Sequence, residues 1–233
     1  MCTVSWWRRE GRLSLRFNRD EQRNRPPAEL PRRCGDLICP RDPQGGGTWI
    51  AVDPAGTVHC LLNFYGSDPA AVPPQPRSRG ELPLLSAGNP EPVRSWLQPQ
   101  AYPPFHLLRI PRSGCVTHVC WDGRRLFDAP AHPEITHWTT SGWNSEAVVR
   151  ARGLLFQQIL EEQGLSESAL HAFHTSTHAE DPGRWPCMRR PDAQTVSISE
   201  ILIDEQRILF RYTPITDQGM HPPHECDQPL QIR

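Results

Sequence analysis

A cysteine stands at position 2 of the chain, where removal of Met1 would make it the first residue. Methionine is commonly removed when the second residue is small, and the trimmed chain then carries a free α-amino group beside the thiol. The unperturbed pKa of an α-amine is about 7.7–8.0, so a neutral fraction can act as a base near pH 7. Cys2 would then supply both the nucleophile and the general base. On position alone, a small core residue of the first strand is the plainer interpretation of Cys2.

A run of polar and charged residues lies at the end of the second predicted strand, with the sequence Asn-Arg-Asp-Glu at residues 18–21. If residues 2–9 and 12–18 pair as an antiparallel hairpin, these side chains lie beside the first residues of the chain. A carboxylate there could hold an α-ammonium group, and an arginine could stabilise a thiolate. Lowering a thiol pKa from about 8.5 to about 7 takes only ~2 kcal/mol, which one close arginine can supply. A solvated strand end is the alternative interpretation.

Six short motifs stand in order along the chain. They are Met1-Cys2, Asn18-Arg19-Asp20-Glu21, Gly46-Gly47-Thr48-Trp49, Asn63, Arg79-Gly80-Glu81-Leu82 and Ser141-Gly142-Trp143-Asn144. In this order they resemble the NRDE family, also called the Transport and Golgi Organisation protein 2 family, over about residues 1–204. The resemblance implies the N-terminal nucleophile (Ntn) hydrolase fold. That fold belongs to the α+β class and is a four-layer αββα sandwich with two mainly antiparallel sheets.

The family is similar to cysteine amidases such as choloylglycine hydrolases and penicillin V acylase, and this similarity implies roles for single residues. Asn18 and Asp20 match the Asn-x-Asp motif of those enzymes, and Asp20 would hold the α-amine of Cys2. The Asn63 side chain would help to form an oxyanion hole. Asn144 would orient the amine or the tetrahedral intermediate.

Two arginines are candidates for tuning the thiolate. The amidases carry an arginine just before their Asn-x-Asp motif, where this chain has Phe17, with Arg16 one position further back. Arg16 or Arg19 would take this role, and the sequence does not separate the two. The segment at Arg190 lacks the Arg-Thr dipeptide common in the family, so Arg190 is not among the candidates. The candidate catalytic residues are Cys2, Arg16, Asn18, Arg19, Asp20, Asn63 and Asn144.

Three tryptophans close in sequence to these motifs are candidate substrate-binding residues, namely Trp6, Trp49 and Trp143. An apolar, aromatic-walled cleft with a few polar groups is the usual small-molecule site. For any single tryptophan, a place in the core of the sheet sandwich is an equally good interpretation.

The order of elements follows from the apolar pattern. Alternating apolar residues predict hairpins, which pair residues 2–9 with 12–18, 48–52 with 57–63, 105–110 with 116–121, and 194–203 with 207–212. Helical spacing predicts helices at residues 146–163, with Ser145 as N-cap, and at 167–174. Residues 22–46 read as irregular and 69–77 as a Pro-rich surface loop. These patterns predict a single domain over residues 1–213 and a Pro-rich tail over 214–233.

The composition argues against several classes of function. Because all 25 basic residues are arginines, lysine-nucleophile and Schiff-base mechanisms are excluded. Ten arginines fall within residues 1–41, but the net charge of −1 and the lack of a binding motif argue against a nucleic-acid partner. No apolar run approaches the roughly 20 residues of a membrane-spanning helix. The first residues do not read as a signal peptide, so we expect a cytoplasmic protein.

Histidines and cysteines suggest two metal-binding clusters, and neither is well supported. The clusters are His171, His174 and His178, and His221, His224 and Cys226. Neither has an acidic partner at a recognised spacing, and the cysteine pairs at 34/39 and 115/120 are not spaced as in zinc knuckles. We therefore expect no metal and no cofactor.

Two functions from different classes remain open. The first is a cysteine Ntn amidase that cleaves a non-peptide acyl amide through an acyl-enzyme on Cys2. The second is a non-catalytic carrier or trafficking factor that binds an apolar ligand in the same cleft. The expected partner is thus a small-molecule acyl amide or an apolar ligand. The sequence leaves a homo-oligomer open.

Overall fold

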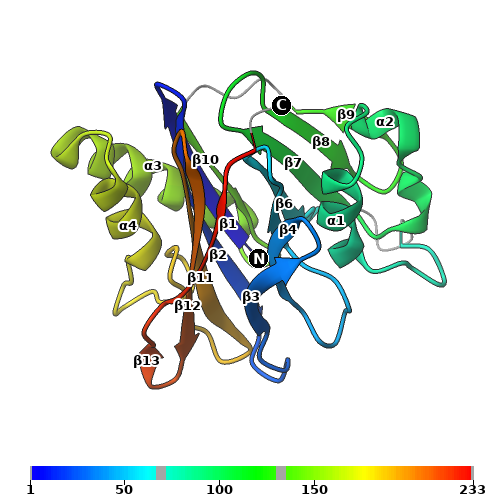
Figure 1. Ribbon diagram of the computed structural model, residues 1–233. Helices are drawn as coiled ribbons and strands as arrows, with labels where there is room; N and C mark the ends of the chain where they lie inside the picture. The colour runs from blue at the N-terminus through cyan, green and yellow to red at the C-terminus, as the bar shows by residue number, and fades with distance from the viewer. Residues whose placement is uncertain (1, 67–71, 130–134, 232–233) are drawn as a thin grey trace.

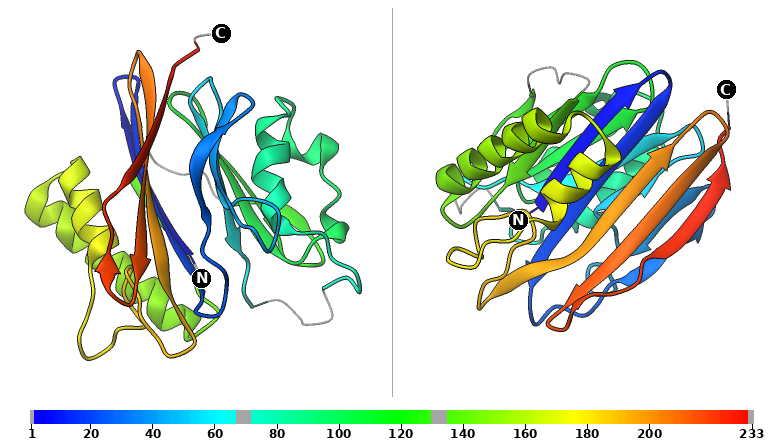
Figure 2. Two further views of the ribbon diagram at one scale, coloured as in Figure 1. Left: turned by 60° about the horizontal axis from the view of Figure 1, so that its bottom comes forward. Right: turned by 90° about the vertical axis from the view of Figure 1, so that its left-hand side faces the viewer.

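Two seven-stranded sheets pack face to face in the computed structural model, which describes residues 2–66, 72–129 and 135–231. Helices cover the outer face of each sheet, so that four layers follow one another (Figure 1; Figure 2, left). All strand pairs among the described residues are antiparallel. The predicted α+β sandwich of two antiparallel sheets is confirmed.

The first sheet holds the beginning of the chain inside it, between the edge strand β10 and β2. Its strand order is β10-β1-β2-β11-β12-β13, and β14 also pairs with β12. The strands are β1 (Cys2–Arg9), β2 (Arg12–Gln22), β10 (Ile135–Thr140), β11 (Ala193–Ile203), β12 (Arg207–Thr216), β13 (Gly219–Met220) and β14 (His224–Pro229). Cys2 lies opposite Arg19 on β2 and Thr140 on β10. The first residue of β1 is therefore held between two strands rather than at a free edge.

The second sheet has the order β3-β4-β5-β6-β7-β8-β9. The strands are β3 (Glu29–Cys34), β4 (Leu37–Arg41), β5 (Ile50–Val52), β6 (Thr57–Asn63), β7 (Phe105–Pro111), β8 (Thr117–Trp121) and β9 (Leu126–Asp128). The prediction that residues 22–46 are irregular is wrong, because β3 and β4 form a hairpin there. β3 is an edge strand with a proline and mostly exposed side chains, so it lacks the alternation that marks a strand.

The helices lie on opposite outer faces of the sandwich. α3 (Ser145–Gln163) and α4 (Glu167–Thr175) cover the first sheet, and α1 (Leu82–Ala87) and α2 (Val93–Trp96) cover the second (Figure 1). The single turns η2 (Arg79–Glu81) and η3 (Pro99–Ala101) flank α1 and α2. The N-cap of α3 is Asn144, with a φ of 44°, and not Ser145. Within the described ranges, no helix is long and apolar enough to cross a membrane.

The two faces of the first sheet differ in polarity. Apolar side chains fill the space between the sheets, among them Val4, Trp6, Leu15, Phe17, Ile50, Val52, Val58, Leu108, Ile201 and Phe210. The face beneath α3 and α4 buries polar side chains, among them Thr3, Ser5, Ser14, Arg16, Asn18 and Ser199. His174 of α4 is buried against them and bonds to Ser5 and Asn18. Because successive residues of a strand point to opposite faces, each polar residue alternates with an apolar one on β1 and β2.

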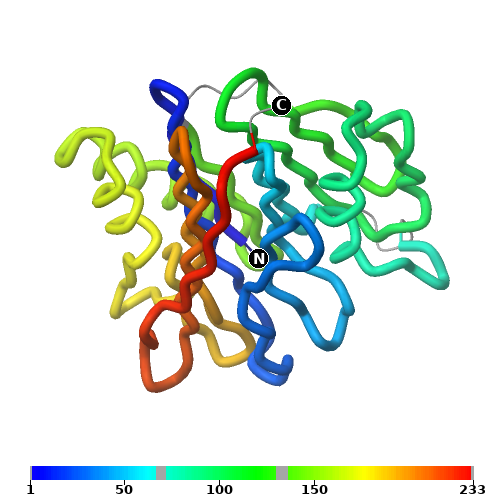
Figure 3. Tube along the Cα trace, in the orientation of Figure 1, coloured from blue at the N-terminus to red at the C-terminus, as the bar shows by residue number. Residues whose placement is uncertain are grey.

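The residues predicted as a C-terminal tail join the first sheet. β12 runs on to Thr216, beyond the predicted boundary at 213, and β14 pairs with it along its length. The red strand β14 runs beside the orange strand β12 in Figure 3. Its sequence, His-Glu-Cys-Asp-Gln-Pro, has no apolar alternation, so backbone pairing alone reveals it as a strand. The predicted loop at residues 69–77 falls partly outside the described residues, and residues 72–77 form neither helix nor strand.

Candidate active site

A cleft of about 1060 Å³ opens at the end of the sandwich where β1 begins. Its walls come from the start of β1, the end of β2, the loop between β4 and β5, the end of β6, and η2. Six of the residues selected from the sequence line it, namely Cys2, Arg19, Asp20, Trp49, Asn63 and Trp143. The fold thus brings together residues that are up to 141 positions apart in the chain (143 − 2).

Cys2 forms part of the cleft wall and is 9% exposed. Burial raises the pKa of the Cys2 thiol. The thiol is therefore in its neutral form near pH 7, and a nucleophilic role requires a base close to Sγ.

Asp20 lines the same cleft, and its carboxylate is fully buried. Its Oδ1 atom accepts a hydrogen bond of 2.6 Å from the Thr195 hydroxyl, and its Oδ2 atom lies 3.7 Å from Nη1 of Arg152. Burial raises the pKa of Asp20, and the nearby Arg152 opposes that rise. Oδ2 has no hydrogen-bond partner among the described residues, so this oxygen is able to accept a proton donor such as an ammonium group.

Arg152 is a site residue that the sequence analysis missed. It is fully buried on α3 and donates to Thr3 Oγ1 at 2.5 Å and to the carbonyls of Arg184 at 2.9 Å and Trp185 at 2.6 Å. It thereby ties the helix layer to β1 and to the carboxylate behind the cleft. The signal in the sequence is its place on the buried stripe of α3, where an arginine without a partner would be costly.

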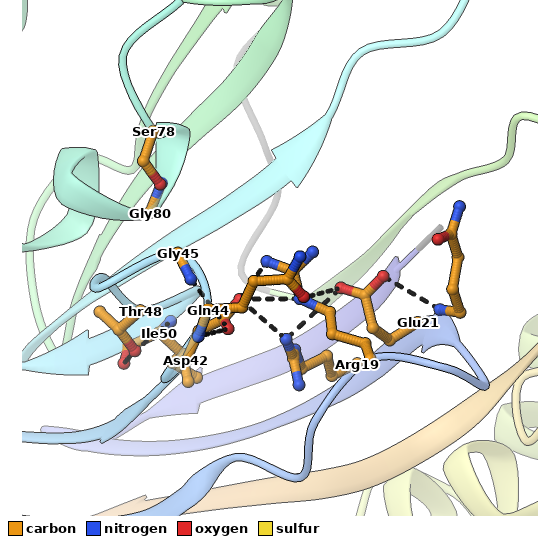
Figure 4. Close-up of polar contacts among 11 residues, drawn as sticks. Arg19, Glu21, Asp42, Gln44, Gly45, Thr48, Ile50, Ser78 and Gly80 are labelled. Atoms are coloured by element: carbon orange, nitrogen blue, oxygen red, sulfur yellow. Dashed lines mark hydrogen bonds and ion pairs between the residues drawn. The ribbon is translucent and has the colours of Figure 1, made fainter.

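Arg19 lies flat on one wall of the cleft. Its guanidinium carbon is 4.2 Å from the centroid of the Trp49 ring, and Nη2 donates to Asp42 at 3.1 Å and to Glu21 at 3.4 Å. Arg25 also donates to Asp42, at 3.0 and 2.5 Å. Figure 4 shows Arg19 together with Asp42 and Glu21 in this network. Burial alone would raise the pKa of Asp42, but the hydrogen bonds from Arg25 and the Gly45 amide outweigh it and lower that pKa. Arg19, Arg25 and the carboxylates of Asp42 and Glu21 therefore form an ionic network in this wall of the cleft.

Asn63 is the last residue of β6 and also lines the cleft. Its Nδ2 atom donates to the Tyr65 hydroxyl at 3.1 Å. A side-chain amide carries two N–H groups, and the contact with Tyr65 uses one of them. The other can donate to a ligand carbonyl in the cleft.

Arg16 and Asn18 do not line the cleft, because they lie on the face of β2 that α4 covers. Arg16 is bonded to Glu200. Asn18 shares a 2.6 Å hydrogen bond with Nδ1 of His174 and donates to the carbonyls of His174 and Pro186. Of the two arginines considered for tuning the thiolate, Arg19 alone reaches the cleft, and Asn18 instead fixes the layer behind it.

Two further candidates also lie away from the cleft lining. Trp6 is fully buried in the apolar core between the sheets, two positions further along the inward face of β1 than Val4. Asn144 is exposed at the start of α3, and its side chain makes no capping hydrogen bond. Its neighbour Trp143 does line the cleft, with Arg190 above the ring at 5.4 Å.

Solved structures similar to this fold are Ntn hydrolases. Penicillin V acylase from Agrobacterium tumefaciens has a TM-score of 0.53 and 12% identity, over 93% of this chain and 84% of the other. A mutant of conjugated bile acid hydrolase from Clostridium perfringens has a TM-score of 0.51 and 10% identity, and the match covers 100% of this chain and 97% of the other. The Caenorhabditis elegans ortholog of N-acylethanolamine-hydrolyzing acid amidase has a TM-score of 0.50 and 12% identity, and the match covers 86% of this chain and 92% of the other. At this level of identity the likeness establishes the fold.

A family model bears on the identity of the chain itself. No curated protein sequence matches the chain. The model described as Transport and Golgi organisation 2 matches residues 1–207, which include the motifs that gave the family resemblance. The chain therefore belongs to the Transport and Golgi organisation 2 family.

Proposed function

We propose that the protein hydrolyses a non-peptide acyl amide through an acyl-enzyme on Cys2, once Met1 has been removed. The observation that carries this proposal is the meeting of Cys2, Asp20 and Asn63 in one cleft. A thiol, a carboxylate and an amide donor are the groups that an Ntn amidase needs. Nothing in ordinary hairpin packing requires Asn63 to approach the start of β1.

The proposed reaction begins with the transfer of the Cys2 thiol proton to the α-amine of the same residue. Sγ attacks the carbonyl carbon of the amide, and the second N–H of Asn63 stabilises the oxyanion. The C–N bond then breaks, the proton passes to the leaving amine, and the acyl group remains on Sγ as a thioester. Water hydrolyses the thioester, which releases the carboxylic acid and restores the thiol.

The surrounding groups suit this sequence of steps. Because burial raises the pKa of Cys2, the thiol needs an adjacent base, and an α-amine on the same residue is as close as a base can be. Oδ2 of Asp20 would hold the resulting ammonium, while Thr195 and Arg152 fix the carboxylate. The similar structures are named as an acylase, a conjugated bile acid hydrolase and an acid amidase, which supports an acyl amide as the substrate class.

The raised pKa of Cys2 also favours a second candidate function, in which the cleft binds a ligand without turnover. A carrier needs the cleft but not a thiolate. The two functions differ in one observable, the formation of a covalent bond between the ligand and Sγ of Cys2.

Intact mass spectrometry of the purified protein with a panel of acyl amides tests the proposal. We expect a mass without Met1, followed by a transient acyl adduct that peptide mapping places on Cys2. The exposed Cys115 is an internal control, because adventitious acylation would appear there first. Full retention of Met1, or an adduct that persists in Cys2→Ala, would refute the mechanism. Ligand binding without any adduct would favour the carrier.

A further inference from the structure

Three metal-binding side chains converge in the interior of the sandwich, outside the cleft. His106 lies on β7, and His118 and Cys120 lie on β8, with exposed fractions of 6%, 3% and 2%. His106 Nδ1 is 3.0 Å from His118 Nε2 and 3.1 Å from Cys120 Sγ, and these last two atoms are 3.5 Å apart. None of the three residues lines the cleft around Cys2.

The strand register brings these residues together. His118 and Cys120 are two positions apart on β8, so they point to the same face of the sheet. Cys120 lies directly opposite His106, and His118 lies opposite Leu108, one diagonal step away. Directly opposed and diagonal neighbours on one face are close enough for side-chain contact. The cluster is therefore fixed by the backbone pairing of two neighbouring strands.

Aromatic rings enclose the cluster. Phe64 stacks on His106 at 5.0 Å, and Trp138 of the first sheet meets His118 at 4.7 Å and His106 at 5.5 Å. Burying polar groups among aromatic rings is costly unless their lone pairs and protons are all matched.

The three donor atoms make three close contacts, and hydrogen bonds with good geometry cannot form at all three at once. A ring nitrogen carries either one proton or one lone pair, which points along a single direction in the ring plane. Nδ1 of His106 has two neighbours at nearly equal distances, so it bonds well with only one of them. A cation at the centre of the triangle would accept all three lone pairs at once.

We propose that His106, His118 and Cys120 bind a divalent transition-metal ion of the Zn²⁺ class. Zinc lies about 2.0–2.1 Å from histidine nitrogen and about 2.3 Å from thiolate sulfur. At tetrahedral angles these lengths separate two nitrogens by about 3.3 Å and nitrogen from sulfur by about 3.6 Å. The three donor atoms therefore need to move apart by only a few tenths of an ångström. The ion replaces the Cys120 thiol proton, which is released to solvent, and a fourth coordination position remains for water.

The clusters that stood out in the sequence do not converge in this way. His174 is bonded to Ser5 and Asn18, and His221 to the Thr216 hydroxyl. Within the described residues, His106, His118 and Cys120 form the one group of three such side chains whose donor atoms come together.

Cobalt substitution tests the proposal directly. The full chain is stripped of metal with a chelator, titrated with Co²⁺ and followed by visible and near-ultraviolet absorption and by native mass spectrometry. We expect one Co²⁺ per chain, tetrahedral d–d bands and a thiolate-to-cobalt charge-transfer band. Zn²⁺ should displace the Co²⁺ and raise the melting temperature. Binding without a sulfur band, or no binding at all, would overturn the proposal.

Matched variants locate the sulfur ligand. Cys120→Ser should abolish the charge-transfer band, whereas Cys226→Ser and Cys2→Ser should keep it. The Cys2 variant matters because a free amine beside a thiol can itself bind cobalt. If Cys120→Ser does not fold, His106→Gln tests the site in its place. This variant should weaken Co²⁺ binding by more than about tenfold. A band that survives in Cys120→Ser, or that is lost in Cys2→Ser, would refute the assignment, and so would unchanged affinity in His106→Gln.

Discussion

Gly47 and Gly80 lie in backbone contact, so close that a Cβ atom on residue 47 would stand 2.2 Å from the carbonyl carbon of Gly80. The Thr48 amide donates to the Gly80 carbonyl at 2.7 Å, and the Asp42 amide donates to the Gly47 carbonyl at 2.9 Å. The first bond joins the loop between β4 and β5 to η2, and the second lies within that loop. Both segments line the cleft, so the Gly-Gly-Thr-Trp and Arg-Gly-Glu-Leu motifs form one structural unit.

Gly47→Ala should therefore destabilise the protein. The added methyl group meets backbone rather than a movable side chain, so the two segments must separate, at a cost of about 1–3 kcal/mol. Chemical denaturation followed by circular dichroism measures this cost. Gly88→Ala is the matched control, since its Cβ would be 3.5 Å from the nearest atom. The control should change the free energy of unfolding by less than about 0.5 kcal/mol. Equal effects in the two variants would contradict the close contact.

Arg152→Ala should be among the most destabilising substitutions in α3. Removing the guanidinium leaves the Asp20 carboxylate buried without its cation, and breaking a buried ion pair in this way costs about 3–5 kcal/mol. Arg150→Ala, at an exposed position of the same helix, should cost less than about 0.5 kcal/mol. Melting temperatures of the two variants make the comparison. A mild effect of Arg152→Ala would mean that the pair is not buried in solution.

The stability of the protein should fall as the pH drops below about 6.5. Burial, followed by the nearby Arg16 and Arg152, holds the pKa of His174 well below its usual value. In this range the unfolded chain takes up a proton that the folded protein does not, so acid favours unfolding down to the folded pKa. His174→Gln removes this proton and should reduce the slope of stability against pH by up to about 1.4 kcal/mol per unit, a limit approached at the acid end of this range. Urea titrations between pH 7 and pH 5 measure the slope, and an unchanged slope would mean that His174 is charged in the folded state.

Much of the fold could be predicted because apolar residues alternate along most strands. The hairpins at residues 2–18, 105–121 and 194–212 all show this alternation. β3 and β14 could not be predicted, because both lie at sheet edges with mostly exposed side chains, and only backbone pairing defines them.

The candidate site was harder to predict than the fold, because strand parity alone does not decide which residues line the cleft: Asp20 has the parity of Asn18 and still lines it. Arg19 lies opposite Cys2, whereas Asn18 faces the helices. Asp20 pairs with Thr195 just beyond a register shift in β11, a feature that no period-two pattern marks. The cluster at His106 depends on pairing between strands, so the spacing along the chain gave no sign of it.

The two asparagines that the family resemblance assigned to catalysis should behave differently when they are replaced. Asn63 lines the cleft with one N–H beyond its contact with Tyr65, so Asn63→Ala should slow acylation of Cys2 by about 10²–10³-fold. Asn144 lies outside the lining, and Asn144→Gly should leave that rate unchanged. Glycine is the suitable replacement there, because it adopts the φ of 44° without strain and keeps the start of α3.

Rapid-quench mass spectrometry on an amide that acylates the native protein gives both rates, and melting curves verify that both variants fold. If Asn144→Gly slows acylation as much as Asn63→Ala, then its side chain reaches the reacting group when substrate is bound. In that case the role implied by the resemblance would hold despite the position of Asn144 here.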